Sequence, residues 1–342
     1  MCLFPKLIRN KKYTPNKKNN GIVPEMKDNR VGTIPVGCGI CMECLKQKGN
    51  AWRARLMEEI KHDKSGVFVT LTLSNEEYTK LYRELENKAE GYTLDNYIAK
   101  KAVRRFLERW RKKHKRSVKH WLVTELGHEG TENIHLHGII FTENIKDLRE
   151  IWKYGFVWDG IKKNKEKINY VTERTINYIM KYVSKVDTDH KYYRPIILCS
   201  PGIGRDYVNT YNFEKNKFKG KETNETYKTN NGRKINLPIY WRNKVYTEEE
   251  REELWLQKLD KGDRYIGGEK VKGDVEEYNR LLKYYQELNR NLGYGEPENW
   301  DAMKYEKERR TLKQKERLVD EEYKQFEKIE PRKINDEDII PF

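Results

Sequence analysis

Ile134-His-Leu-His-Gly-Ile-Ile-Phe141 is the stretch that decides the fold of this 342-residue chain. It is dense in apolar and β-branched residues, which predicts a strand that is buried for most of its length. Successive side chains of a strand point to opposite faces of the sheet. His135 and His137 are therefore expected on one face, and Leu136 on the other.

A second predicted strand, Lys119 to Leu126, precedes this one along the chain. The intervening loop carries Gly127 and Gly130 and is polar, as is typical of a hairpin connection. A hairpin of this kind would bring the carboxylate of Glu125 beside the two imidazoles. The sequence therefore predicts a metal site made of His135, His137 and Glu125.

A helix is predicted about forty residues further on, from about Glu173 to Val186, because this stretch lacks Gly and Pro and carries regularly spaced apolar residues. Tyr178 and Tyr182 are four residues apart and so share one face of that helix. Each is followed three residues later by a lysine, Lys181 and Lys185. Packing alone explains two phenols with two cations poorly, because a packing face has no need of the charges.

Three cysteines occur within seven residues, in the pattern Cys38-x-x-Cys41-x-x-Cys44. Thiolates at this spacing can bind zinc when a fourth ligand comes from elsewhere in the chain. Cys2 and His62 are the candidates for that ligand. An iron–sulfur cluster and a set of reduced, buried thiols are the alternatives, and the spacing leaves all three open.

The chain is basic, with a formal net charge of +16, and the charge is unevenly distributed. Residues 1–246 hold 50 Lys and Arg against 28 Asp and Glu, whereas residues 247–342 hold 20 against 26. A positive field on the part that carries the motifs favours a polyanion such as DNA. Simple solubility is the alternative explanation of the charge.

A predicted helix from Asp95 to Lys115 carries the densest positive charge, because residues 100–120 hold eleven Lys and Arg and one acid. Like charges at this spacing repel one another unless an anion neutralises them, which favours phosphate binding. A glycine-rich loop, Ser200 to Tyr207, adds a further arginine. The predicted DNA-binding residues are Arg104, Arg105, Arg109, Arg111, Lys112 and Arg205.

No stretch approaches the 18 or more apolar residues of a membrane span, and the N-terminus lacks the apolar core of a signal peptide. We therefore expect no membrane partner and a cytoplasmic location. Hydrophobic and charged residues each make up 36% of the chain, which is polar for a globular protein, so we expect extended or solvated segments beside one core.

The alternation of strands and helices predicts an α+β fold. Strands are expected at 66–73, 119–126, 134–142 and 155–158, with 168–171 as an edge strand or the lead-in to a helix. The predicted organisation is a basic arm with the Cys cluster and a helix (1–64), a core (65–210), a basic loop region with Tyr240-Trp-Arg242 as candidate base-stacking residues (211–246) and a charged helical extension (247–342).

Four features together resemble the HUH endonucleases that start rolling-circle replication, in particular their two-tyrosine branch. They are the Cys38 to Cys44 stretch, Phe68-Val-Thr-Leu-Thr-Leu73, the His-Leu-His strand, and the tyrosine helix followed by Ser200-Pro-Gly-Ile-Gly204. The wider pattern resembles the initiators of gokushovirus-type microviruses, which are related to the microvirus A protein. The resemblance covers roughly residues 30–210. It implies an antiparallel sheet of about five strands with helices on one face.

The resemblance also implies an activity, that of a site-specific DNA endonuclease and strand transferase. Mg²⁺ or Mn²⁺ on the histidines and the glutamate, with Tyr178 and Tyr182 as nucleophiles, would nick the origin strand of phage DNA. The products would be a 5′-phosphotyrosine link and a 3′-OH primer, and the strand would later be rejoined. Host helicase and replication proteins in a bacterial cytoplasm would be the partners. The alternatives are a relaxase- or transposase-like HUH nuclease and a non-catalytic single-stranded nucleic-acid-binding protein.

Overall fold

The computed structural model describes residues 2–160, 170–272 and 274–327, and a five-stranded antiparallel sheet lies at its centre. The strand order is β6-β3-β5-β4-β7, with β3 Gly66–Thr72, β4 Lys119–Leu126, β5 Ile134–Phe141, β6 Val157–Trp158 and β7 Ile197–Cys199. The predicted α+β class and the antiparallel sheet are confirmed. Residues 168 and 169 of the expected edge strand lie outside the described residues, and Tyr170 forms an antiparallel bridge with Val67.

One face of the sheet is covered by α3 (Gly91–His114), together with α2 (Asn75–Arg83) and α4 (Ile145–Ile151). α3 presents a stripe at helical spacing that is fully buried and includes Ile98, Ala102 and Phe106. The strands contribute their alternate residues, such as Leu136 and Ile140, to the same core. This side of the sheet is the larger apolar cluster of the molecule.

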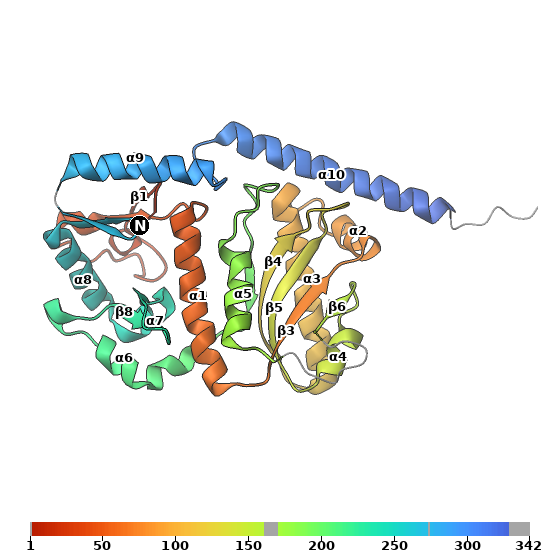
Figure 1. Cartoon of the computed structure of the whole chain (residues 1–342), viewed down its shortest axis with the longest axis horizontal. Helices are drawn as coiled ribbons and strands as arrows, with labels where there is room; N and C mark the ends of the chain where they lie inside the picture. The colour runs from red at the N-terminus through yellow and green to blue at the C-terminus, as the bar shows by residue number, and fades with distance from the viewer. Residues whose placement is uncertain (1, 161–169, 273, 328–342) are drawn as a thin grey trace, which may run out of the picture.

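The opposite face is covered by α5 (Glu173–Ser184), and α1 (Met42–His62) packs along α5 (Figure 1). The expectation of helices on one face only is therefore wrong. The reason is that this face also carries large apolar side chains, Phe68, Trp121 and Ile139, which would otherwise remain in water. α5 buries Ile176, Ile179, Met180 and Val183 against them.

The segment predicted as a basic loop region contains regular structure around a small core. Its elements are α6 Tyr211–Asn216, β8 Thr226–Lys228, β9 Lys234–Asn236 and α7 Ile239–Val245. Trp241 is fully buried and stacks on Tyr207 with 3.9 Å between ring centroids, and its Nε1 donates to the Gly204 carbonyl. Trp241 is therefore a core residue, and the prediction that it stacks on bases is wrong.

The remaining elements belong to the N-terminal arm and the C-terminal part. The arm forms a hairpin of β1 (Lys6–Arg9) and β2 (Thr33–Val36). The expected C-terminal helices are present as α8 Glu248–Lys261, α9 Val275–Asn291 and α10 Trp300–Glu327, although residues 328 and 329 at the predicted end of the last helix lie outside the described residues. An unpredicted hairpin, β10 Asp263–Ile266 and β11 Glu269–Lys272, joins α8 to α9. Among the described residues, none of the helices combines the length and the apolar character that crossing a membrane requires.

α10 runs across the core (Figure 1) and is attached by buried ion pairs rather than by an apolar stripe. Arg310 is 1% exposed and bonds Asp95 on α3 at 2.8 Å and Glu132 in the β4–β5 loop at 3.0 Å. Arg317 lies 3.9 Å from the ring centroid of Tyr78 on α2. The expectation that these helices are mostly solvated is wrong for this face of α10.

Replacing Arg310 by alanine should therefore be strongly destabilising. The change leaves the carboxylate of Asp95 buried without its cation, and breaking a buried pair in this way costs about 3–5 kcal/mol. The free energy of unfolding from chemical denaturation measures the effect. Lys304→Ala, which removes an exposed cation of the same helix, is the matched control and should cost less than about 1 kcal/mol. Equal losses in the two variants would contradict the role of Arg310.

Candidate active site

β5 places His135 and His137 on the face of the sheet that α5 covers, as the alternation of the strand predicts. In the β4–β5 ladder, Glu125 lies opposite His135 and Val123 lies opposite His137. The carboxylate of Glu125 reaches diagonally across the ladder, so that its Oε2 lies 2.8 Å from Nε2 of His137. The structure therefore brings the predicted acid to the second histidine.

His137 is held from three sides and is 9% exposed. Its Nδ1 lies 3.0 Å from Oγ1 of Thr70 on β3, and its ring stacks on that of Tyr182 with 4.0 Å between centroids and 1° between planes. When Nδ1 donates its proton to Thr70, Nε2 is left as a lone-pair donor. The sequence interpretation missed Thr70, although its register position opposite His137 in a predicted strand could have indicated it.

The surroundings of Nε2 test whether a cation fits. This nitrogen is buried and has no hydrogen-bond partner of acceptable geometry among the described residues, although a carboxylate oxygen lies 2.8 Å away. Two electron-rich atoms that approach each other without a hydrogen bond are suited to sharing a cation. Imidazole nitrogen with carboxylate oxygen is also a donor set that divalent metals accept.

His135 lies on the same face, and its ring centroid is 6.3 Å from that of His137. Burial, aided by the neighbouring His137, lowers the pKa of His135, which keeps the imidazole neutral and able to bind a metal. The donor atoms of His135, His137 and Glu125 are not gathered within 4.8 Å of one another, as those of two other groups in the described part of the chain are. The three residues therefore share a face without forming a closed cage.

The two tyrosines of α5 stand beside this set. Their hydroxyl oxygens are 2.9 Å apart. Tyr178 is 47% exposed, whereas Tyr182 is half-buried against His137. The Lys181 ammonium lies 3.7 Å from the ring centroid of Tyr178 and 4.9 Å from that of Tyr182. The predicted helix thus carries both phenols and one of its lysines to the histidines.

The two phenols differ in acidity. The hydrogen bond from Tyr182, followed by the ammonium of Lys181, lowers the pKa of Tyr178 below its usual value near 10. Burial, followed by the hydrogen bond to Tyr178, raises the pKa of Tyr182. Tyr178 is therefore the readier nucleophile of the pair.

A cavity adjoins the site beyond the end of α5. Tyr182 and Glu125 line it, and so do several cations that no pattern in the sequence indicated, apart from Lys185: Lys48, Lys185, Lys191 and Arg194. Burial lowers the pKa of Lys48, whose Nζ donates to the Pro195 carbonyl at 3.2 Å. Within the described ranges Lys48 has no carboxylate partner, so an anion entering the cavity would meet an uncompensated charge.

The predicted DNA-binding residues on α3 lie away from this site. α3 covers the opposite face of the sheet, where Arg104 pairs with Glu108 and Arg105 with Glu84. Arg109 donates to the Ile151 carbonyl, and the exposed residues of the predicted set are Arg111, Lys112 and Arg205. The structure does not bring the α3 residues together with the tyrosines.

Two arginines of α1 lie on the same side of the sheet as the tyrosines. The guanidinium of Arg55 is sandwiched between the rings of Trp52 and Tyr240, 4.1 Å from each centroid, and burial lowers its pKa. Arg53 is also half-buried, and its Nε has no hydrogen-bond partner among the described residues. Trp52 packs edge-on against Trp121 and is thus a core anchor.

A second cluster near the cavity, His128, Asp187 and His190, has donor atoms close enough to hold a metal. His190 is, however, engaged on both sides: Nδ1 lies 2.9 Å from Asp187 and Nε2 lies 3.0 Å from Glu132, which also binds Arg310. Burial alone would lower the pKa of His190, but the two carboxylates raise it overall. A protonated imidazole that bridges two acids explains this cluster without a metal.

We expect a pH dependence of stability from His190. Its folded-state pKa is raised, so its protonation contributes stability that is fully present below about pH 6.5 and is lost as the pH rises through the raised pKa. The free energy of unfolding, measured by denaturation between about pH 5.5 and 9, should fall over this window and fall less in His190→Gln. The exposed His62→Gln is the control, and an unchanged profile in His190→Gln would contradict the assignment.

The fold and this site define a class: an α+β domain whose central sheet presents two histidines and an acid to a pair of helix-borne phenols, suited to nicking a nucleic acid. Residues 66–187, about a third of the chain, match a family model of replication-associated proteins, of the ORF2 type. The matched segment runs from β3 past the end of α5 and includes the histidines and the tyrosines. This similarity supports rolling-circle replication initiation and the nicking activity that such initiators generally have. No curated protein and no solved structure matches the chain.

Replacing Thr70 by valine should weaken metal binding at His137. The change removes the group that fixes the Nδ1 side of the imidazole, and loss of such a partner typically costs about 10- to 100-fold in metal affinity. Titration with Mn²⁺ measures the affinity. Thr79→Val, at a buried threonine of α2 whose hydroxyl has no described partner, is the control and should leave the affinity unchanged. Undiminished Mn²⁺ affinity in Thr70→Val would speak against His137 as a ligand.

Proposed function

We propose that this protein starts rolling-circle replication of a small phage genome of the gokushovirus type, by nicking the origin strand through tyrosine transesterification and later rejoining it. The observation that carries the proposal is the contact of Tyr182 with His137, because it sets a candidate metal ligand directly against a pair of phenols whose hydroxyls are 2.9 Å apart. Such nucleases need these two groups within reach of one phosphate.

His135, His137 and Glu125 would hold the divalent ion, Mg²⁺ or Mn²⁺. The buried Nε2 beside the Glu125 oxygen is the observation that fits an ion there. When bound, the ion would offset the charge that develops on the phosphate oxygens. Thr70 would keep the His137 ring in the orientation that faces the acid.

The reaction would begin at Tyr178. Its phenol is the more exposed of the two and accepts a hydrogen bond from Tyr182, with the Lys181 ammonium beside its ring. The phenol loses its proton and its oxygen forms a bond to phosphorus, while the bond from phosphorus to the 3′-oxygen breaks and that oxygen takes up a proton. A 5′-phosphotyrosine and a free 3′-OH result, with the bond energy retained in the covalent link.

Tyr182 would act in the second half of the cycle. It would attack the regenerated origin, and the 3′-OH released there would attack the Tyr178 link and close a circle. Once Tyr178 is esterified it can no longer act as a phenol acid, so the hydrogen bond that ties the Tyr182 hydroxyl to Tyr178 would be lost. The second phenol would thereby become available after the first is used.

The single strand would follow the cations on the α1 side of the sheet. Lys48 and Lys185 line the cavity next to Tyr182, and Arg53 and Arg55 continue along α1. These side chains have few acid partners in the described chain, unlike the paired arginines of α3. We keep the exposed Arg111, Lys112 and Arg205 as outlying contacts to duplex DNA. A bacterial cytoplasm and host replication proteins, a helicase among them, complete the proposal.

Tyrosine variants test the proposal. With Mn²⁺ and a labelled single-stranded origin oligonucleotide, we expect Tyr178→Phe to lose at least about 100-fold in adduct formation, because the first nucleophile is removed. Tyr182→Phe should still form an adduct but should fail to release closed circles. The double variant should form no adduct. Adducts are read on denaturing gels and mapped by mass spectrometry.

Tyr211→Phe is the matched control, since Tyr211 is 74% exposed and lies on α6, outside the site. A double variant that still forms adducts would overturn the chemistry and leave a non-catalytic nucleic-acid-binding protein. Loss of adduct in Tyr182→Phe with full retention in Tyr178→Phe would reverse the proposed order. Equal cleavage of hairpin transfer substrates and of circular single strands would favour the relaxase- or transposase-like alternative.

A further inference from the structure

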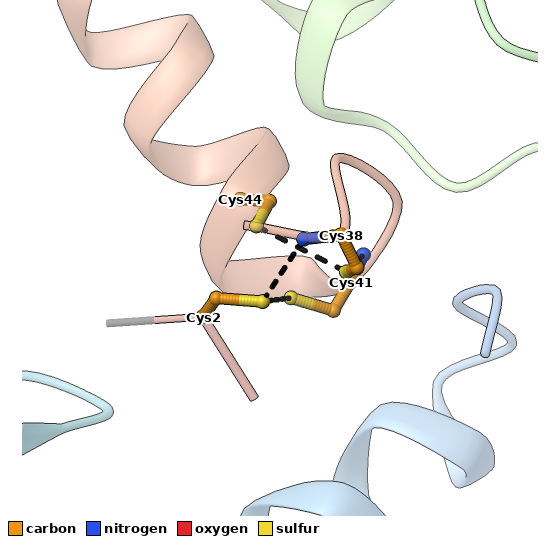
Figure 2. Close-up of side chains that lie close together, drawn as sticks. All are labelled: Cys2, Cys38, Cys41 and Cys44. Atoms are coloured by element: carbon orange, nitrogen blue, oxygen red, sulfur yellow. Dashed lines mark hydrogen bonds between the residues drawn. The ribbon is translucent and has the colours of Figure 1, made fainter. Parts of the chain in front are cut away.

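Cys2, Cys38, Cys41 and Cys44 gather at the N-terminal end of α1 (Figure 2). All four sulfur atoms lie within 4.8 Å of one another, with 3.9 Å between the sulfurs of Cys2 and Cys41 and 4.0 Å between those of Cys38 and Cys44. None of the four forms a disulfide. One ligand thus comes from the start of the chain, two from the loop before α1 and one from its first turn.

These sulfur distances match a tetrahedron around one ion. A zinc–sulfur bond of about 2.3 Å places tetrahedral thiolates about 3.8 Å apart. A disulfide would need sulfurs at about 2.05 Å, which is far shorter than the distances here. A cubane iron–sulfur cluster lies between its thiolates and so holds them farther apart than a single ion does.

The backbone around the sulfurs is arranged to stabilise negative charge. The Sγ of Cys2 accepts N–H groups from Cys38 at 3.2 Å and Phe4 at 3.3 Å, and the Sγ of Cys38 accepts the N–H of Cys41 at 3.4 Å. Hydrogen bonds of this kind fix ligands from the second layer and favour thiolates over thiols. Four thiolates without a cation would repel one another, so the arrangement calls for a positive ion.

We propose that these four cysteines bind one structural zinc ion that joins the N-terminus to α1 and the C-terminal part. Cys41 is fully buried in one cluster with Leu3 and Ile266, against which Leu282 of α9 packs. α9 also caps α1 directly, because Asn289 Oδ1 accepts the N–H of Met42 at 2.9 Å. His62, the other sequence candidate, is at the far end of α1, about 27 Å along the helix axis from Cys44, and cannot be the fourth ligand.

The zinc site would shape the nuclease site without taking part in its chemistry. Gly39 and Ile40, in the loop between the ligands, line the same cavity as Tyr182 and Glu125. α1 in turn packs along α5, which carries the tyrosines. All coordination positions of a four-thiolate zinc are filled by protein, which is the arrangement of structural rather than catalytic sites.

Metal analysis of the purified full-length protein tests the proposal. We expect one zinc per chain by mass spectrometry after gel filtration, and less than a tenth of that in Cys38→Ser and Cys41→Ser. Cys199→Ser is the matched control, because Cys199 is the fifth cysteine and lies on β7, away from the cluster, and this variant should keep its zinc. His135→Ala/His137→Ala should keep it too, which separates this site from the nuclease metal.

Two measurements on the wild-type chain remain decisive if the serine variants fail to fold. Titration with an organomercurial should release one zinc as four thiols react, and replacement by Co²⁺ should give the visible absorption of a tetrahedral thiolate site. Iron in place of zinc, with a coloured protein, would overturn the assignment, as would four reactive thiols with no metal. Loss of zinc in His135→Ala/His137→Ala with retention in Cys38→Ser would place the ion at the nuclease site and overturn it as well.

Discussion

The pairing register of β4 and β5 is the constraint on which the rest of the molecule depends. Eight residue pairs, from Lys119 with Phe141 to Leu126 with Ile134, lock the two strands together. A slip by one residue would move both histidines into the apolar core and expose the residues between them. Gly138 enforces the register, since a Cβ atom at this position would collide with the backbone of Trp121 and Leu122. The ladder therefore fixes the core and the site together.

The second constraint is the position of α5 between the sheet and α1. Its apolar stripe binds it to the sheet, and the capping box at Thr172 and Thr175 fixes where it begins. These two features determine which residues of α5 stand over His137, and they place Tyr182 in stacking contact with it. The phenols are therefore positioned by ordinary core packing, which costs the site no flexibility of its own.

The strands, the tyrosine helix and the long α3 could be predicted from sequence because their patterns are local and periodic. The short β7 and the β10–β11 hairpin were missed, since three or four residues give no period to detect. The core around Trp241 was missed because its apolar residues are isolated aromatics in a basic segment. The same limit applied to the site: the histidines and tyrosines lie in motifs, whereas Thr70 and Lys48 reach them only through tertiary contacts. The charge density of α3 indicated a positive surface but not the acids that neutralise it.

The two candidate metal sites are separated by their chemistry as well as by their place. Thiolates hold zinc tightly and fill its coordination shell, which suits a site that ties the N-terminus to α1. Imidazoles with one carboxylate bind a hard divalent ion more weakly and leave positions for phosphate oxygens. The donor atoms follow this division, because the four sulfurs converge within 4.8 Å whereas His135, His137 and Glu125 stay more open, next to a 47%-exposed phenol. A closed shell in the scaffold and an open one at the reacting phosphate allow one chain to hold two metals without exchange between them.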